Sequence, residues 1–142
     1  MSHLWEELTS AQLADRLAAD PDCVALIPVG ATEQHGPHLP VGTDTIIATA
    51  LAEAATVAVV LPPLPFGVSF FHGTRKAGTV AFSGEETAAT AGLVAEACVD
   101  SGFRWLLFVN GHVGNAPRCG SRAIAFAGTF PTYASAWCNG GI

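Results

Sequence analysis

The sequence is short of charge, and above all of positive charge. Only 13% of its 142 residues are charged, and six Lys and Arg stand against twelve Asp and Glu, for a formal net charge of −6. Nucleic acids and anionic membranes bind to basic surfaces, so this composition argues against both as partners. Half of the residues are hydrophobic, which leaves little charged surface for a monomer. We therefore expect a homo-oligomer.

Long hydrophobic runs and paired cysteines are also missing. Prolines and charged residues interrupt each apolar segment before it reaches the roughly 18 residues that a membrane span needs. The first ten residues, MSHLWEELTS, lack the basic start and apolar stretch of a signal peptide. The four cysteines (Cys23, Cys98, Cys119 and Cys138) form no CxxC pair and no disulfide framework. These absences predict a cytoplasmic protein with reduced thiols and no membrane association.

Apolar segments alternate with helical patterns along the chain. Residues 24–30 (VALIPVG) are apolar throughout, as expected of a central strand in a parallel sheet that helices cover on both faces. Residues 104–110 (RWLLFVN) are apolar from Trp105 to Val109 and predict a further buried strand. Residues 56–64 (TVAVVLPPL) and 131–137 (PTYASAW) predict two further strands. This alternation predicts a single domain over residues 1–142, with a three-layer α/β/α sandwich and a mostly parallel sheet.

Capping motifs mark the helices that separate these strands. Thr9 with Gln12, and Ser83 with Glu86, have the spacing of a capping box at a helix start. Another helix is predicted to begin near Thr43 and to bury an apolar stripe. The stripe consists of Ile46, Ile47, Ala50, Leu51 and Ala54.

Two polar loops follow predicted strands. GATEQHGPHLPVGTD (30–44) comes after the first strand, and NGHVGN (110–115) begins where the strand at 104–110 ends. The carboxyl ends of parallel strands lie at one edge of a sheet, where folds of this kind bind ligands. We therefore expect the two loops to meet. The second loop is also expected to open a helix that Asn115 caps.

Four residues of these loops are candidate metal ligands: Glu33, His35, Asp44 and His112. Carboxylates and imidazoles together suit borderline divalent cations, zinc first, with manganese or iron as alternatives. An extended backbone would point Glu33 and His35 to the same side, and Asp44, at a helix start, could bridge two ions. Each residue alone has a plainer structural interpretation. Together they favour a metal site, because two carboxylates in one apolar pocket repel unless a cation lies between them.

The loops resemble the signature of the creatininase (creatinine amidohydrolase) family of metal-dependent amidohydrolases. PVGATEQHGPHLPVGTD is a long and specific match, NGHVGN supports it, and GVSFFHGTRKAGT is a weaker echo of a family loop. The resemblance implies a creatininase-like fold and two divalent metal ions held by Glu33, His35, Asp44 and His112, with Asp44 as the bridge. It also implies metal-assisted hydrolysis of a non-peptide or cyclic C–N amide bond in a small molecule.

The sequence also departs from that family. Family members are usually longer, and their later part contributes a HAGE-like segment whose glutamate completes the metal site. In creatininase itself a glutamate two residues after the second-motif histidine has this role, but Gly114 stands there in this sequence. The chain thus resembles a creatininase-like domain without the family's C-terminal part. A truncated, catalytically impaired domain that acts as a metal-binding or interaction subunit is therefore the alternative interpretation.

Hydrolysis of an amide also requires a proton for the leaving nitrogen, and His72 and His38 are the candidate catalytic residues for this step. His38 has an alternative role in orienting its loop, and His72 could instead lie in solvent beside a substrate lid. A nucleophilic mechanism through Ser69 or Cys119 is less favoured, because neither residue lies in the sharp elbow motif of such hydrolases.

Overall fold

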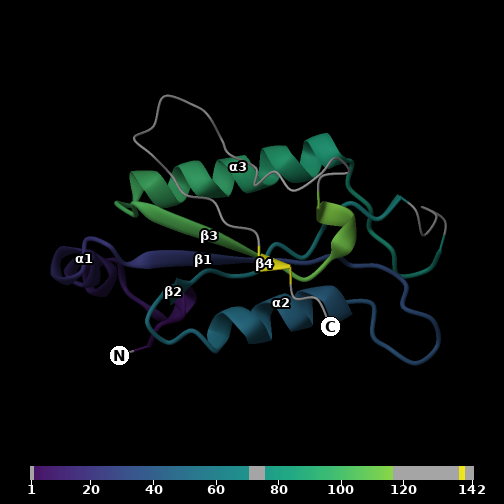
Figure 1. Cartoon of the computed structure of the whole chain (residues 1–142), viewed down its shortest axis with the longest axis horizontal. Helices are drawn as coiled ribbons and strands as arrows, with labels where there is room; N and C mark the ends of the chain where they lie inside the picture. The colour runs from purple at the N-terminus through teal and green to yellow at the C-terminus, as the bar shows by residue number, and fades with distance from the viewer. Residues whose placement is uncertain (1, 71–75, 117–137, 140–142) are drawn as a thin grey trace.

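A computed structural model describes residues 2–70, 76–116 and 138–139 of the chain (Figure 1). The elements are, in order, η1 (Trp5–Glu7), α1 (Ser10–Ala19), β1 (Val24–Val29), α2 (Thr43–Glu53), β2 (Val59–Val60), α3 (Gly84–Asp100), β3 (Trp105–Asn110), η3 (Val113–Asn115) and β4 (Cys138–Asn139). The strand predicted at 131–137 lies outside the described residues. Among the helices of the described part, none is both long and apolar enough to cross a membrane.

The four strands in the described part of the chain form one parallel sheet in the order β2-β1-β3-β4. β1 and β3 pair over their full length, from Val24 opposite Trp105 to Val29 opposite Asn110. α2 covers one face of the sheet and α3 covers the opposite face (Figure 1). The three-layer α/β/α sandwich with a parallel sheet is therefore confirmed.

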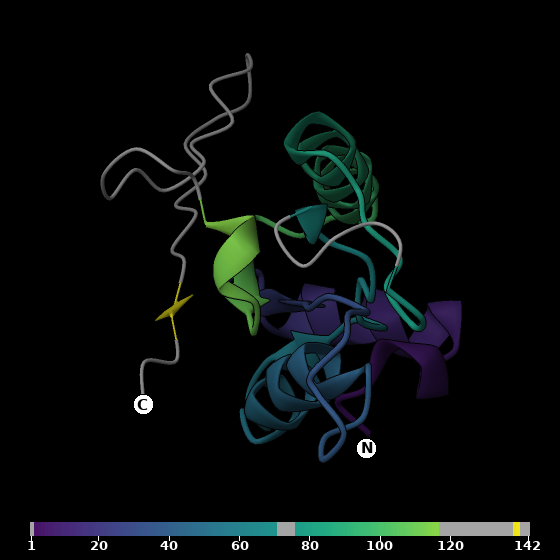
Figure 2. The same cartoon turned by 90° about the vertical axis from the view of Figure 1, so that its right-hand side faces the viewer.

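The strand order reverses direction between β1 and β3. After β1 the chain passes through α2 to β2 on one side of β1, and then crosses back through α3 to β3 on the other side. Parallel sheets bind ligands at such a reversal of strand order. Figure 2 looks onto this edge, where η3 and the loop that leads into α2 both lie.

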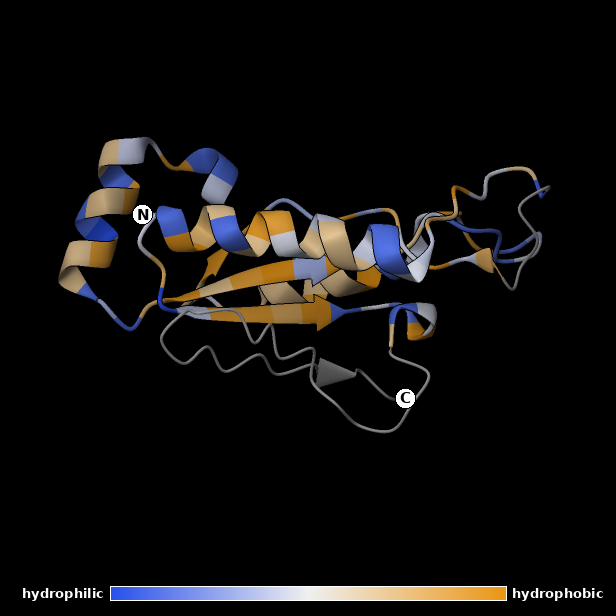
Figure 3. Ribbon diagram, turned by 90° about the horizontal axis from the view of Figure 1, so that it is seen from above, coloured by the Kyte–Doolittle hydropathy of each residue, from blue (hydrophilic) through white to orange (hydrophobic). Residues whose placement is uncertain are grey.

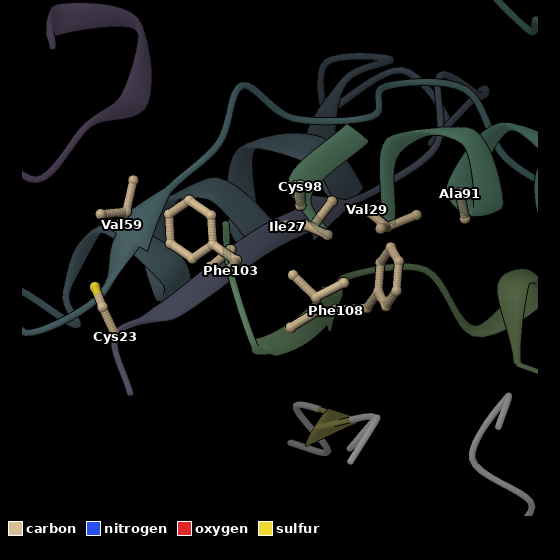
Figure 4. Packing of buried hydrophobic residues seen from close by; sticks show 10 residues of the cluster. Cys23, Ile27, Val29, Val59, Ala91, Cys98, Phe103 and Phe108 are labelled. Atoms are coloured by element: carbon tan, nitrogen blue, oxygen red, sulfur yellow. The ribbon is translucent and has the colours of Figure 1, made fainter. Parts of the chain in front are cut away.

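Among the described residues, buried side chains form one apolar cluster on each face of the sheet. The larger cluster, toward α3, comprises Cys23, Ala25, Ile27, Val29, Val59, Ala91, Cys98, Phe103, Leu106 and Phe108 (Figure 4). The smaller cluster, toward α2, comprises Leu26, Ala52, Ala58, Val60 and Val109. Successive residues of β1 thus serve opposite faces, which explains why its sequence is apolar throughout. Figure 3 shows the consequence, with hydrophobic strands beneath helices of mixed hydropathy.

Cys23 and Cys98 agree with the expectation of reduced thiols. Cys23 and Cys98 are free thiols, and both are buried. Burial raises the pKa of the Cys98 thiol to about 11, so this thiol stays protonated and unreactive at neutral pH.

Both predicted capping boxes are present. The Thr9 side chain accepts the Gln12 N–H, and Gln12 accepts the Thr9 N–H in return. Ser83 and Glu86 exchange the same two bonds at the start of α3. Two hydrogen bonds with Ser83 lower the pKa of the Glu86 carboxyl below its usual 4.5. The bond with the Ser83 backbone has the larger effect, and the bond with the Ser83 side chain has the smaller. The charged form of Glu86 therefore adds stability that is lost as the pH falls through this lowered pKa.

Replacing Ser83 with alanine tests this cap. Ser83→Ala is expected to lower the free energy of unfolding by about 1 kcal/mol, because the Glu86 N–H at the helix start loses its acceptor. The matched control is Ser101→Ala at the other end of α3, where an exposed hydroxyl donates to the Ala97 carbonyl. The control should change stability by less than about 0.5 kcal/mol. Urea unfolding measures both, and equal losses would contradict the capping role.

α2 buries a different face from the one predicted. The stripe predicted as buried is exposed: Ile46, Ile47, Ala50, Leu51 and Ala54. Asp44, Ala48 and Ala52 are buried in its place. The reason is the close approach of α2 to Gly111, where an added Cβ would lie 3.1 Å from the Cβ of Ala48. Only small side chains fit that contact, so the predicted face was wrong.

Candidate metal centre

Glu33, His35, Asp44 and His112 lie together at the carboxyl edge of the sheet. Glu33 and His35 follow β1, Asp44 lies in the first turn of α2, and His112 follows β3. Glu33, Asp44 and His112 are 4, 7 and 5% exposed, and His35 is half-buried. The two polar loops expected from the sequence to meet are therefore in contact.

Asp44 lies between the two histidines. Its Oδ1 is 3.3 Å from His35 Nε2, and its Oδ2 is 2.8 Å from His112 Nδ1. Glu33 Oε2 is 3.7 Å from His112 Nε2. One potential ligand atom from each of Glu33, His35 and Asp44 lies within 4.8 Å of the others. Each carboxylate oxygen of Asp44 therefore faces the imidazole of a different histidine.

Backbone carbonyls orient both imidazole rings. His35 Nδ1 is 3.1 Å from the Glu33 carbonyl oxygen, and His112 Nε2 is 3.0 Å from the Val68 carbonyl oxygen. The other nitrogen of each ring faces Asp44. Histidine ligands of metals typically donate their second N–H to such an acceptor, which fixes the ring. Both rings are thus held with one nitrogen directed at the carboxylate.

The charges around His112 favour a positive group. Burial disfavours the imidazolium and by itself lowers the pKa of His112. Hydrogen bonds with Asp44 and with the Val68 carbonyl, together with the charges of Glu33 and Asp44, outweigh burial and raise this pKa above its usual 6.5. The same two carboxylates would attract a divalent cation.

Glycines allow the loops to come this close. A Cβ added at Gly30 would overlap Thr45, and one at Gly111 would overlap the Asp44 carbonyl oxygen. At Gly114 it would overlap the His112 ring and the Val68 carbonyl oxygen. The backbone itself therefore forms the contacts between the segments that carry the four residues.

The remaining candidates from the sequence do not join this group within the described residues. His38 is exposed on the loop that contains His35. Ser69 is 1% exposed, and its hydroxyl has no hydrogen-bond partner among the described atoms. His72 and Cys119 lie outside the described residues.

Asn115 has a place that the sequence did not indicate. It is the last residue of η3, a single short turn that begins after His112, and the helix expected after it falls outside the described residues. Its side chain bonds to three other segments, through Gly30, Val68 and Asn110. An asparagine after a strand has the same sequence signal in either role, so only the fold distinguishes them.

A family model supports the resemblance seen in the loops. The model of the creatininase family, described as creatinine amidohydrolase, matches residues 6–129. The chain belongs to the creatininase family. The resemblance inferred from the two motifs is confirmed.

Several curated proteins are similar to this chain in sequence. The mycofactocin precursor peptide peptidase of Mycolicibacterium smegmatis is 44% identical over 108 residues, which cover 65% of this chain and 40% of that protein. The creatinine amidohydrolase of Pseudomonas putida is 32% identical over 117 residues, 78% of this chain and 45% of that protein. The chain thus spans less than half the length of these relatives.

Solved creatininase structures share the fold. A Zn–Zn type mutant and a manganese form each superpose with a TM-score of 0.75 at 32% identity, over 82% of this chain. They are covered over 47% and 48% of their own lengths. These two creatininases are thus named as zinc and manganese forms.

The residues of this chain fit such a cation. Two buried carboxylates converge on two imidazoles whose outer nitrogens are held by carbonyls, and this donor set suits zinc, manganese or iron. Carboxylates buried close together need positive charge between or beside them. A divalent cation held by these side chains would provide that charge.

Proposed function

We propose that this chain is the metal-binding part of a creatininase-family amidohydrolase, which cleaves a C–N amide bond with water. The observation that carries the proposal is the contact of Asp44 with both His35 and His112, beside Glu33. Two bound divalent cations, zinc first and manganese or iron as alternatives, would supply Lewis-acid activation of water and of the amide carbonyl.

The protein side chains have distinct tasks in this proposal. Asp44 serves both imidazoles through its two oxygens, and its position in the first turn of α2 favours the ionised carboxylate. Glu33 adds a second carboxylate, whose Oε2 lies 3.7 Å from His112 Nε2. His38 and His72 stay the proposed proton donors for the leaving nitrogen.

The substrate class follows from the relatives only in outline. One relative is named a peptide peptidase and another a creatinine amidohydrolase. A peptidase and an amidohydrolase both cleave an amide bond. We therefore propose an amide substrate, with the small non-peptide or cyclic amide expected from the sequence and a short peptide as the two forms to test.

A metal-binding domain without turnover is the second candidate. The observation that favours it is the crowding at Gly114, because a Cβ there would overlap His112 and the Val68 carbonyl oxygen. A ligand side chain at this position has no room in the present arrangement. Any further ligand must come from elsewhere in the assembly.

Metal analysis and turnover test these proposals together. The chain purified without added metal is expected to contain a divalent cation, and His35→Ala is expected to lose most of it. Glu96→Ala, on the exposed part of α3, is the control and should keep it. Hydrolysis of creatinine or of a short peptide should stop on chelation and return with zinc or manganese.

The outcomes separate the candidates. Metal content that His35→Ala leaves unchanged would show that the site is assigned wrongly. Bound metal without turnover would favour the second candidate. The homo-oligomer expected from the composition stays a prediction, which sedimentation of the purified chain can test.

A further inference from the structure

Asn115 is a buried asparagine whose whole carboxamide is engaged. It is 8% exposed. Its Nδ2 donates to the Gly30 carbonyl oxygen at 3.0 Å and to Asn110 Oδ1 at 3.2 Å, and its Oδ1 accepts the Val68 N–H at 2.9 Å. One side chain thereby joins the end of β1, the end of β3 and the loop that contains Val68.

Val68 connects this side chain to the candidate metal centre. Its N–H is held by Asn115, and its carbonyl oxygen lies 3.0 Å from His112 Nε2. Asn110 holds the other side of the same turn, because its side chain accepts the His112 N–H and donates to the His112 carbonyl. His112 is therefore fixed at its ring and at its backbone by groups that Asn115 contacts.

Close packing leaves this arrangement little room to change. A Cβ at Gly67 would overlap Asn115 Oδ1, and one at Gly114 would overlap both His112 Nε2 and the Val68 carbonyl oxygen. Movement of the asparagine side chain would thus be transmitted to Val68. Movement of Val68 would in turn alter the acceptor of the His112 ring.

We propose that Asn115 is a positioning residue, which holds the Val68 carbonyl against His112 Nε2 and so keeps Nδ1 as the nitrogen presented to a cation beside Asp44. The inference rests on the proposed metal-binding function and deepens it. Asn115 itself contacts neither a ligand atom of Asp44 nor one of Glu33 in any of these hydrogen bonds. It acts through Val68. Outer residues of this kind typically change metal affinity by about 10- to 100-fold.

The test compares Asn115→Leu, which removes all three hydrogen bonds but keeps the number and branching of the side-chain heavy atoms, with Cys98→Ala, a core change on the α3 side of the sheet. Competition with a chelator is expected to show about 10- to 100-fold weaker Co²⁺ binding for Asn115→Leu and a changed Co²⁺ absorption spectrum. Cys98→Ala is expected to be destabilised yet to keep the wild-type affinity and spectrum. Asn115→Ser, which leaves room for water, is the second variant if Asn115→Leu does not fold.

A readout without metal separates this proposal from the proposed function. In the metal-free chain, the proton on His112 Nε2 should be protected by the Val68 carbonyl and visible in nitrogen-15 spectra, and it should be lost in the Asn115 variants. Wild-type affinity and an unchanged His112 signal in these variants would overturn the positioning role. If the wild type binds no cation while the variants still lose this signal, the proposed function fails and the positioning role stands.

Discussion

Asp44→Asn is expected to lower divalent-cation affinity by more than about 100-fold, beyond the range typical of changes that only touch a ligand. Asp44 is the side chain that contacts both His35 and His112, at 3.3 and 2.8 Å. Asparagine keeps the shape but removes the charge, and it offers one acceptor oxygen where the carboxylate has two. Hydrolysis should fall with the bound metal. Titration with zinc, followed by elemental analysis, measures the loss.

The control for this change is Asp100→Asn, the same substitution at an exposed position in the last turn of α3. It should leave cation affinity unchanged. A metal content in Asp44→Asn equal to that of wild type would mean that Asp44 is not a ligand. The pairing of the two histidines through Asp44 would then be a structural contact alone.

Two glycine-to-alanine substitutions are expected to change stability in opposite directions. Gly111→Ala should lower the free energy of unfolding by about 1–3 kcal/mol, since its Cβ would overlap the Asp44 carbonyl oxygen and lie 3.1 Å from the Ala48 Cβ. Gly84→Ala should raise it by about 0.4–1 kcal/mol, because Gly84 begins α3 and no atom lies within 4 Å of the added Cβ.

Urea unfolding of both variants, with and without zinc, measures these effects. Gly111→Ala should also weaken zinc binding, because the clash displaces the first turn of α2 and with it Asp44. Gly84→Ala should bind zinc as the wild type does. An unchanged stability of Gly111→Ala would contradict the close contact between the end of β3 and α2.

Local sequence signals predicted the elements because each of these signals acts over a few residues. The capping boxes at Thr9 and Ser83 need only a partner three positions later. The apolar runs that became β1 and β3 need only burial on both faces. Because the carboxyl ends of parallel strands lie at one edge of a sheet, the two polar loops and their candidate ligands could also be predicted to meet.

The buried face of α2 could not be predicted in the same way. The helix is apolar on two sides, one of alanines and one of larger aliphatic residues. Hydrophobicity alone favours the second, with Ile46, Ile47 and Leu51, but these are 58, 44 and 51% exposed. The distance between α2 and Gly111 decided the outcome, and a distance between segments remote in sequence leaves no periodic pattern.

The network around Asn115 escaped prediction for a related reason. The sequence shows glycines at positions 67 and 114, but it does not show which distant residues pack against them. The bonds from Asn115 to Gly30 and Val68 span 85 and 47 positions. Only the completed sheet brings these partners into reach.

The candidate ligands come from segments that the unfolded chain keeps far apart. Glu33 and His35 stand after β1 and His112 after β3, so a shared cation would tie together two ends of a long stretch of polypeptide. Such a tether can form only when β1 and β3 already lie in register, because the local Glu33–His35 pair alone offers too few donors. A cation bound at this site would therefore indicate that β1 and β3 are correctly paired. Because the unfolded chain would bind the cation only weakly, binding would stabilise the folded state.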